Sequence, residues 1–315
     1  MSFTELRPTM PSTTLPRSHL DEAATPAAAI AMVCGTYALF SVLDAAGKYL
    51  VGLGFAPAMV VWVRFAVHGI ILIAVLKAWS NRQVWAMARP GLHMVRSTLL
   101  PATTLLNFAA LQFLQLDQTV AIFLATPLAI TALAGPILGE WAGPRRWAAV
   151  LVGFIGVLIV VRPGSAVFTP PILLSVGAML TYGLYSVMTR KLANSETQQS
   201  LNFYPTLFGS LLMLPLALLD WRLPTAPLEI SLFLLTGLVG LTGHLLLIKA
   251  SKLTAASKLA PFQYTQLLWM VGLGYFVFGD VPDGWTALGA AVIVASGLYL
   301  LHRERAVRRQ TAAES

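Results

Sequence analysis

Charged side chains are scarce in this sequence: they make up 11% of the 315 residues, whereas 57% are hydrophobic. A soluble domain carries about 25% charged residues, so the composition excludes an ordinary soluble protein. The net charge of +8 could indicate nucleic-acid binding. However, the basic residues gather in short connectors between apolar segments, as in a membrane protein. We therefore expect a lipid bilayer around the chain and no nucleic-acid partner.

Cysteine and the common catalytic motifs are also nearly absent. The single Cys34 excludes a disulfide within the chain and a metal cluster of cysteines. The sequence contains no HExxH motif, no nucleophile elbow and no GxxxxGK[ST] phosphate-binding loop. These absences exclude an ATP-driven pump made of this chain alone. A membrane-embedded enzyme acting on lipid remains only as a lower-ranked alternative. We expect no enzyme activity, no cofactor and no metal.

Long apolar runs are what the sequence has in abundance. A membrane-spanning helix needs about 20 mostly apolar residues, and ten segments qualify or come close. They cover residues 27–49, 57–78, 91–112, 118–138, 145–162, 170–190, 202–219, 228–249, 257–278 and 284–302. We therefore predict an all-α integral membrane protein with ten transmembrane helices. The connectors are so short that the function must lie among the helices.

Lys and Arg are concentrated at alternate ends of these segments. If the N-terminus lies in the cytoplasm, most of the 21 basic residues fall on the cytoplasmic side, as the positive-inside rule requires. Residues 1–26 are rich in Pro, Ser and Thr and lack the apolar core of a signal peptide. They predict a disordered cytoplasmic tail, and residues 304–315 predict a basic cytoplasmic tail.

Two short sequence echoes indicate an internal duplication. Residues 36–42 read TYALFSV and residues 181–187 read TYGLYSV, at an offset of 145; Gly139-Glu140 recurs as Gly279-Asp280, at an offset of 140. We therefore predict two copies of one unit, residues 27–165 and 166–303. Each copy holds five spans, an odd number, so the second enters the membrane from the opposite side. Such inverted-topology repeats are typical of transporters that work by alternating access.

One stretch resembles a known family. It runs from Ala110-Leu111-Gln112 through Thr126-Pro127 and Gly139-Glu140 to Arg162-Pro163, and Arg64-Phe65 lies in the second span. Together these features resemble the EamA-type branch of the drug/metabolite transporter superfamily, over nearly all of residues 27–303. The resemblance implies two inverted five-helix repeats, an inner-membrane location and transport of amino acids or other small metabolites, often outward.

We therefore expect a monomeric secondary transporter of the cell inner membrane that exports amino acids or similar small metabolites. An alternative is efflux of drugs or other metabolites. The substrate site should lie near mid-membrane, between the two repeats, because transporters of this kind bind there.

Asp44 is the most informative charge within a predicted span. A carboxylate inside a membrane is costly unless it is paired, so it is a functional candidate by default. In one interpretation it carries a proton that competes with substrate. In the other it forms a salt bridge with Lys48, one helical turn away. His244 in the eighth span is the second candidate for proton coupling, although a histidine there is more often a packing residue.

Three further charged residues are expected to be structural. Arg64 could hold a substrate carboxylate, but the family resemblance favours a structural role within the bundle. Glu140 and Asp280 should accept hydrogen bonds from helix N-terminal amides at the next short turn.

Polar and aromatic side chains within the spans are the candidates for contacting substrate. Amides beside aromatic rings suit a neutral organic molecule, although both types of residue also link helices or anchor spans at the interface. The predicted substrate-binding residues are Tyr37, Ser41, Trp62, Asn107, Thr126, Tyr182, Tyr185, Gln263 and Gln266.

Overall fold

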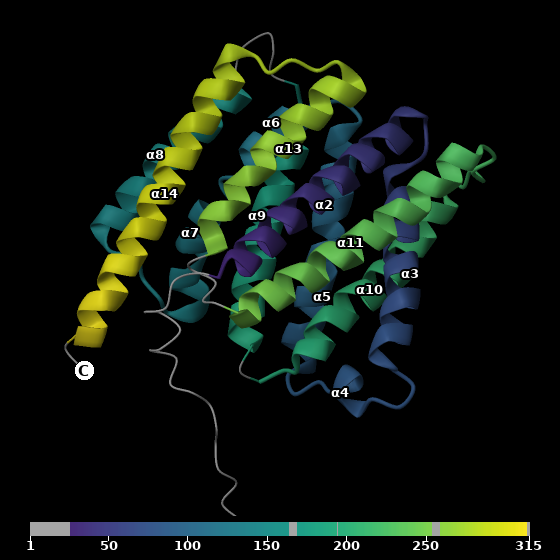
Figure 1. Ribbon diagram of the computed structural model, residues 1–315, viewed down its shortest axis with the longest axis horizontal. Helices are drawn as coiled ribbons and strands as arrows, with labels where there is room; N and C mark the ends of the chain where they lie inside the picture. Colours follow the sequence, from purple (N-terminus) through teal and green to yellow (C-terminus); the bar gives the residue numbers. More distant parts are fainter. Residues whose placement is uncertain (1–25, 164–168, 194, 254–258, 314–315) are drawn as a thin grey trace, which may run out of the picture.

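The computed structural model describes residues 26–163, 169–193, 195–253 and 259–313. The tail expected over residues 1–26 lies, except for Pro26, outside these ranges. Every regular element within them is a helix (Figure 1). The first half of the chain forms α2 (Ala27–Gly52), α3 (Pro57–Leu76), α4 (Arg82–Trp85), α5 (Pro90–Leu111), α6 (Leu116–Phe123), α7 (Thr126–Leu138) and α8 (Pro144–Val161).

The second half contains a matching series. It forms α9 (Ile172–Leu192), α10 (Gln198–Leu218), α11 (Pro227–Leu253), the 3₁₀-helix η1 (Ala260–Tyr264), α13 (Thr265–Leu273), the π-helix η2 (Gly274–Phe278) and α14 (Gly284–Ala313). The last helix continues well past the span predicted to end at residue 302, into the predicted basic tail.

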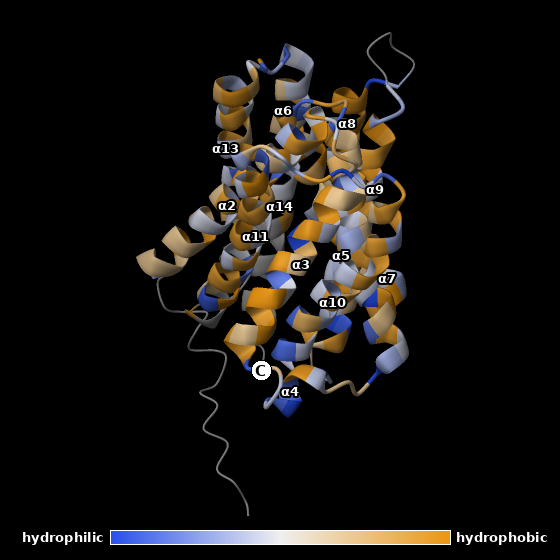
Figure 2. Ribbon diagram, turned by 90° about the vertical axis from the view of Figure 1, so that its right-hand side faces the viewer, coloured by the Kyte–Doolittle hydropathy of each residue, from blue (hydrophilic) through white to orange (hydrophobic). Residues whose placement is uncertain are grey.

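Seven helical segments are long and apolar enough to cross a membrane: α2, α3, α6 with α7, α8, α9, α10 and α11 as far as Ala250. The all-helical membrane architecture is therefore confirmed over the described residues, while the number of ten crossings stays a prediction. Apolar residues make up much of the helices, shown in orange in Figure 2, and many of their side chains are exposed. The exposed examples include Ile70, Leu151, Phe154, Leu268 and Phe276. Such a surface suits contact with lipid tails.

The helix packing is symmetric under exchange of the two halves. α2 packs on α11 and α9 packs on α5; α3 packs on α10 and α8 packs on α14; α13 packs on α2 and α7 packs on α9. In Figure 1, α8 and α14 lie together at one side of the bundle, and α3 and α10 lie at the other. Each of these contacts thus has a counterpart when the halves are exchanged.

The helix pair α8–α14 approaches closely at two glycines. A Cβ atom at Gly289 would lie 2.7 Å from the carbonyl oxygen of Gly156, and one at Gly156 would lie 3.0 Å from the carbonyl oxygen of Gly289. Without side chains at these positions the two backbones come into contact, which is a usual way to associate helices in a membrane.

Two segments that were each predicted as one span are interrupted. α6 ends at Phe123 and α7 begins at Thr126, with Pro127 in its first turn, where proline is tolerated because its missing N–H needs no partner. The segment after residue 259 changes from 3₁₀ to α to π geometry. Irregular backbone at membrane depth is tolerated where it lines a cavity, and both segments border the central cavity described below.

Candidate functional site

A central cavity lies among helices of both halves. It encloses about 1010 Å³ of space, including its open end, and side chains from α2, α3, α5, α6, α7, α9, α11, η1 and α13 line it. Nine residues singled out from the sequence are among them: Tyr37, Asp44, Arg64, Asn107, Thr126, Tyr182, His244, Gln263 and Gln266. The structure thus brings together residues that are up to 229 positions apart in the sequence.

Helix α5 holds two opposite charges on one wall of this cavity. Asn107 Nδ2 donates a hydrogen bond to Asp44 Oδ1 over 3.0 Å, and Arg64 Nη1 donates to Thr104 Oγ1 over 2.7 Å. Thr104 and Asn107 are three residues apart, so they lie on one face of α5. Asp44 from α2 and Arg64 from α3 are therefore anchored about one helical turn apart.

Aromatic rings and amides form the remainder of the wall. The rings of Phe123 and Tyr182 pack with their centroids 5.4 Å apart, and those of Tyr37 and Phe40 are 6.3 Å apart, edge to face. Gln263 Nε2 is buried and lacks a hydrogen-bond partner within the described ranges. This part of the site can stack a flat molecule and donate hydrogen bonds to it.

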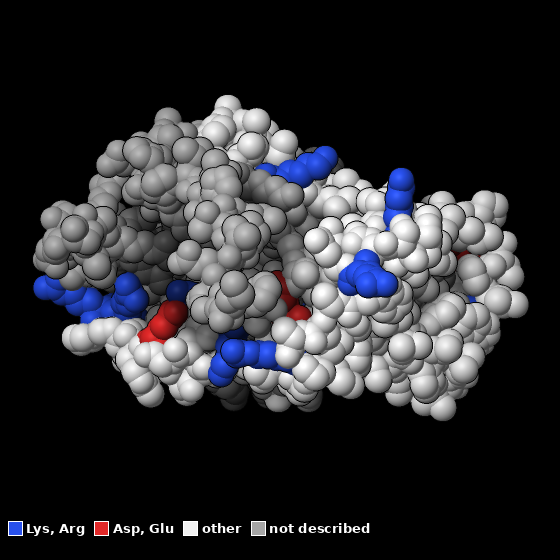
Figure 3. Space-filling model, turned by 90° about the horizontal axis from the view of Figure 1, so that it is seen from below, with Lys and Arg blue, Asp and Glu red and all other residues white. Residues whose placement is uncertain are grey.

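A second cavity, of about 1100 Å³ including its open end, adjoins the first. The two share Leu100 and His244 as lining residues, and the second extends to Gln83 in α4 and to Gln198 and Gln199 at the start of α10. α4 lies at the bottom of Figure 1, and Figure 3 views the molecule from that side. Several Lys and Arg side chains, in blue, are exposed there. The central site therefore has a route toward this end of the bundle.

His244 lies at the junction of the two cavities. Its ring packs 5.1 Å from that of Phe40 and 5.9 Å from that of His68, measured between centroids. This position is compatible with both expectations for His244, a packing residue and a residue of the site.

Three predicted substrate-binding residues do not line the central cavity. Ser41 is buried and donates to the carbonyl oxygen of Tyr37 within its own helix, over 2.8 Å. Trp62 packs on Trp221, with ring centroids 5.5 Å apart. Tyr185 lines the second cavity instead. The sequence placed all three within spans but could not show which way each side chain points.

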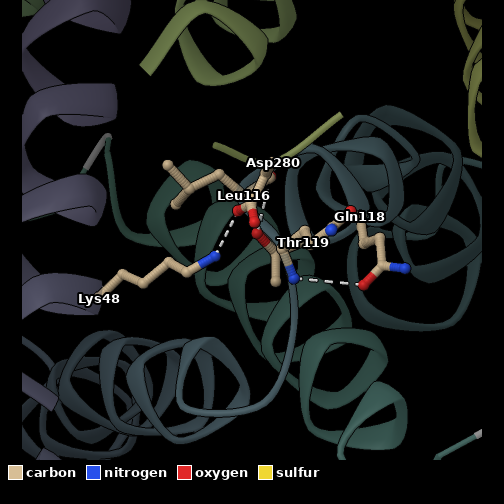
Figure 4. A network of polar contacts seen from close by, with 6 residues as sticks. Lys48, Leu116, Gln118, Thr119 and Asp280 are labelled. Carbon is tan, nitrogen blue, oxygen red and sulfur yellow. Dashed lines mark hydrogen bonds and ion pairs between the residues drawn. The ribbon is translucent and has the colours of Figure 1, made fainter. Parts of the chain in front are cut away.

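Of the two interpretations of Asp44, the salt bridge with Lys48 is wrong. Lys48 Nζ lies 2.6 Å from Asp280 Oδ2, in the connector between η2 and α14, as Figure 4 shows. The Lys48 ammonium also lies 4.7 Å from the centre of the Phe278 ring. Lys48 therefore interacts with the other half of the chain, because its long side chain can extend to the end of the bundle.

The capping roles predicted for Glu140 and Asp280 are wrong as well. Glu140 pairs with Arg190, 2.9 Å away, and Asp280 pairs with Lys48. The capping residue at the start of α14 is Asp283, whose Oδ1 accepts a hydrogen bond from the backbone amide of Thr286 over 2.6 Å. Asp283 also pairs with Arg162.

The glycines before Glu140 and Asp280 explain why the two dipeptides echo each other. Gly139 and Gly279 have φ angles of +76° and +71° and end α7 and η2. The amides of Glu140 and Asp280 both bond back to the carbonyl oxygen six residues earlier. This is the C-terminal capping geometry that favours glycine.

Arg96 is a buried residue whose importance the sequence did not reveal. Its Nε donates to Thr189 Oγ1 over 2.7 Å, Nη1 donates to the carbonyl oxygen of Leu201 over 2.8 Å, and Nη2 donates to Tyr185 Oη over 2.8 Å. It therefore joins α5 to α9 and α10. The sequence signal was a basic residue a full turn inside the predicted span 91–112.

Comparison with known proteins places the chain in a family. The model of the EamA-like transporter family matches residues 27–162 and again residues 169–302. The chain belongs to the EamA-like transporter family. It is 30% identical over 267 residues to a riboflavin transporter of Vibrio cholerae serotype O1, which covers 84% of this chain and 90% of that protein.

Other transporters resemble the chain to a similar degree. It is 27% identical over 265 residues to an S-adenosylmethionine uptake transporter of Rickettsia prowazekii, covering 84% of this chain and 89% of that protein. It is also 27% identical to a pseudopaline exporter of Pseudomonas aeruginosa, covering 77% and 85%. These findings make the chain a membrane transporter of small molecules, and they point away from an enzyme.

Proposed function

We propose that this EamA-like transporter is a monomeric secondary transporter that carries an amino acid or a similar small metabolite by alternating access. The cargo binds in the central cavity, and the two halves, residues 27–165 and 166–303, are inverted repeats that rock about it. The direction is outward across the cell inner membrane, with both termini in the cytoplasm.

The observation that carries this proposal is the position and lining of the central cavity. It lies among helices of both halves and next to both interrupted segments, where a transporter with inverted repeats binds its substrate. The packing of the helices is symmetric under exchange of the halves, which supports a motion in which one end closes while the other opens.

The lining also supports a cargo that has both polar atoms and a flat part. Asp44, Arg64 and Asn107 provide charged and amide groups, while Phe123 and Tyr182 provide packed rings. A small-molecule site of this kind has a mostly apolar wall with a few well-placed polar groups.

A second candidate is uptake of a larger heterocyclic metabolite. The aromatic wall favours it, as do the names of relatives that transport riboflavin or take up S-adenosylmethionine. Both compounds contain a flat nitrogen heterocycle that rings can stack on.

Transport by the full-length chain in proteoliposomes tests the proposal. Vesicles loaded with a mixture of amino acids should release a subset of them faster than protein-free vesicles do. Uptake of riboflavin and S-adenosylmethionine is measured in parallel. Release of amino acids supports the first candidate, uptake of a heterocycle replaces it with the second, and movement of neither contradicts the proposed cargo classes.

A further inference from the structure

Asp44 and Arg64 form a pair of opposite charges on one wall of the central cavity. Both line it, one from α2 and one from α3, and two side chains a turn apart on α5 anchor them. Two Cβ atoms three or four residues apart on one helix face are about 5–6 Å apart. The two charged side chains are therefore held close together by neutral partners, Asn107 and Thr104. Neither partner neutralises the charge that it holds.

Each charged group retains unused hydrogen-bonding capacity. Asp44 accepts the bond from Asn107 at one oxygen, and its other oxygen, Oδ2, has no partner within the described part of the chain. A guanidinium offers five N–H donors. Arg64 uses Nη1 on Thr104, and its Nε is buried without an acceptor among the described residues. A bound molecule could therefore complete both groups.

The charge balance of the wall restricts which molecule fits. With histidine neutral, Asp44 and Arg64 are the charged residues among the described residues that line the cavity. An organic cation would be attracted to Asp44 but repelled by Arg64 close by, and an anion would meet the opposite conflict. A molecule with both charges on adjacent atoms is attracted to both groups, since charge-assisted hydrogen bonds form on each side.

We propose that the cavity selects a zwitterionic headgroup of the α-amino acid type, with its ammonium on Asp44 and its carboxylate on Arg64. The ring of such a molecule extends toward Phe123 and Tyr182, which line the same cavity. This assignment rests on the proposed transport function and adds the group that sets specificity. It also separates riboflavin, which carries no such headgroup, from amino acids and from S-adenosylmethionine, which contains an α-amino-acid group.

Three indole compounds with the same ring and different charges test the proposal. They are L-tryptophan, which is zwitterionic, tryptamine, which is cationic, and indole-3-propionate, which is anionic. Equilibrium binding of each radiolabelled compound is measured on the detergent-purified full chain. We expect tryptophan to bind about tenfold or more tightly than either analogue, since each lost charged hydrogen bond costs about 1.5 kcal/mol or more.

Single neutralising variants should reverse this order. Asp44→Asn keeps a side chain of the same shape beside Asn107 and leaves a positive cavity, so indole-3-propionate should bind as well as tryptophan or better. Arg64→Gln leaves a negative cavity, so tryptamine should gain in the same way. Asp220→Asn and Arg145→Gln remove the same charges at exposed positions and should leave the order unchanged.

The outcomes separate this proposal from the proposed function. Equal binding of the three compounds to the wild-type chain, or an unchanged order in Asp44→Asn, overturns the headgroup assignment. If Arg64→Gln does not elute as a single species on gel filtration, the Asp44→Asn result decides alone. If none of the indoles binds while proteoliposomes still take up riboflavin, the headgroup assignment fails and the transport function stands.

Discussion

Lys48 and Asp280 join the two halves of the transporter at one end of the bundle, 2.6 Å apart. Lys48 is near the end of the first helix of one half, and Asp280 follows Gly279, the capping glycine of the other half. Arg190 and Glu140 form the counterpart, 2.9 Å apart, with the halves exchanged. Asp280 lies beside Leu116, where α6 begins, as Figure 4 shows, whereas Glu140 follows the end of α7. The two ion pairs therefore lie at opposite ends of the α6–α7 segment.

The burial of these two ion pairs differs. The side chains of Lys48 and Asp280 are 14% and 18% exposed, but those of Arg190 and Glu140 are 57% and 47% exposed. An exposed ion pair contributes little to stability, whereas breaking a more buried one leaves an uncompensated charge. We therefore expect the Lys48–Asp280 pair to contribute more than the Arg190–Glu140 pair to holding the two halves together.

Removing the charge of Lys48 should open the Lys48–Asp280 end of the bundle more often. In a Cys34→Ser background, a cysteine at the buried position Leu116 reports access from that side through its reaction with a membrane-impermeant maleimide. Lys48→Gln should raise the labelling rate about tenfold, which corresponds to about 1.4 kcal/mol in the opening equilibrium. Glu140→Gln should raise it much less. Restoration of slow labelling by the exchanged pair Lys48→Asp with Asp280→Lys would confirm the pairing, and equal rates in Lys48→Gln and wild type would contradict it.

A second prediction concerns proton coupling, for which Asp44 and His244 were both candidates. Asp44 presents a carboxylate oxygen without a partner among the described residues, whereas His244 packs between Phe40 and His68. If proton binding at Asp44 competes with substrate, an imposed pH gradient should drive transport in wild type and in His244→Gln. Asp44→Asn should show no response to the gradient, because an amide cannot bind the proton. A response to the gradient that persists in Asp44→Asn would exclude this carboxylate as the coupling site.

A third prediction tests the close packing of α8 on α14. A Cβ atom at Gly289 would lie 2.5 Å from Val160 Cγ2 and 2.7 Å from the carbonyl oxygen of Gly156, so one of the helices must move. Gly289→Ala should therefore destabilise the protein by about 1–3 kcal/mol, seen as a lower melting temperature in detergent.

Gly272 provides the matched control for this prediction. A Cβ atom there would meet nothing within 4 Å, and alanine favours a helix by up to about 1 kcal/mol over glycine. Gly272→Ala should be neutral or slightly stabilising. Equal melting temperatures for the two variants would contradict a tight contact between α8 and α14.

The all-helical membrane fold could be predicted because it depends on local properties of the sequence. Length and apolarity identify helices such as α3 directly. The interruption before Thr126-Pro127 cannot be seen in hydropathy, which stays high there, and its local signal is the proline. α5 is more polar than an ordinary span because it contains Arg96 and Asn107. Both side chains bond to side chains of neighbouring helices, which the sequence alone does not show.

The candidate site could be predicted in composition but not in geometry. A buried Asp44 attracts attention on energetic grounds alone, and the structure does place it in the central cavity. Its partner could not be predicted, because Asn107 is 63 residues away and Lys48 is only one turn away. Proximity along a helix favours Lys48, but the long lysine side chain reaches the other half of the chain instead. Tertiary packing thus decided a choice that sequence spacing could not.

The last prediction concerns Asp283, which lies outside the membrane-spanning helices, directly before the first residue of α14. Burial alone would raise the pKa of this carboxyl. The hydrogen bond from the Thr286 amide and the pairing with Arg162 outweigh burial and hold the pKa below its ordinary value. A lowered pKa in the folded state contributes stability above the ordinary pKa of about 3.9, and this contribution is lost as the pH falls through the folded value.

The melting temperature in detergent should therefore fall between about pH 5 and pH 3 in the wild type, the window just around and below that ordinary pKa. The fall should be smaller in Asp283→Asn, which keeps a capping side chain but cannot titrate. Asp283→Ala should melt lower than both at neutral pH, because an N-cap contributes about 1 kcal/mol. Asp220→Asn, at an exposed position, should follow the wild-type pH profile. If Asp283→Asn also follows that profile, the carboxylate at the start of α14 does not contribute to the acid sensitivity of the fold.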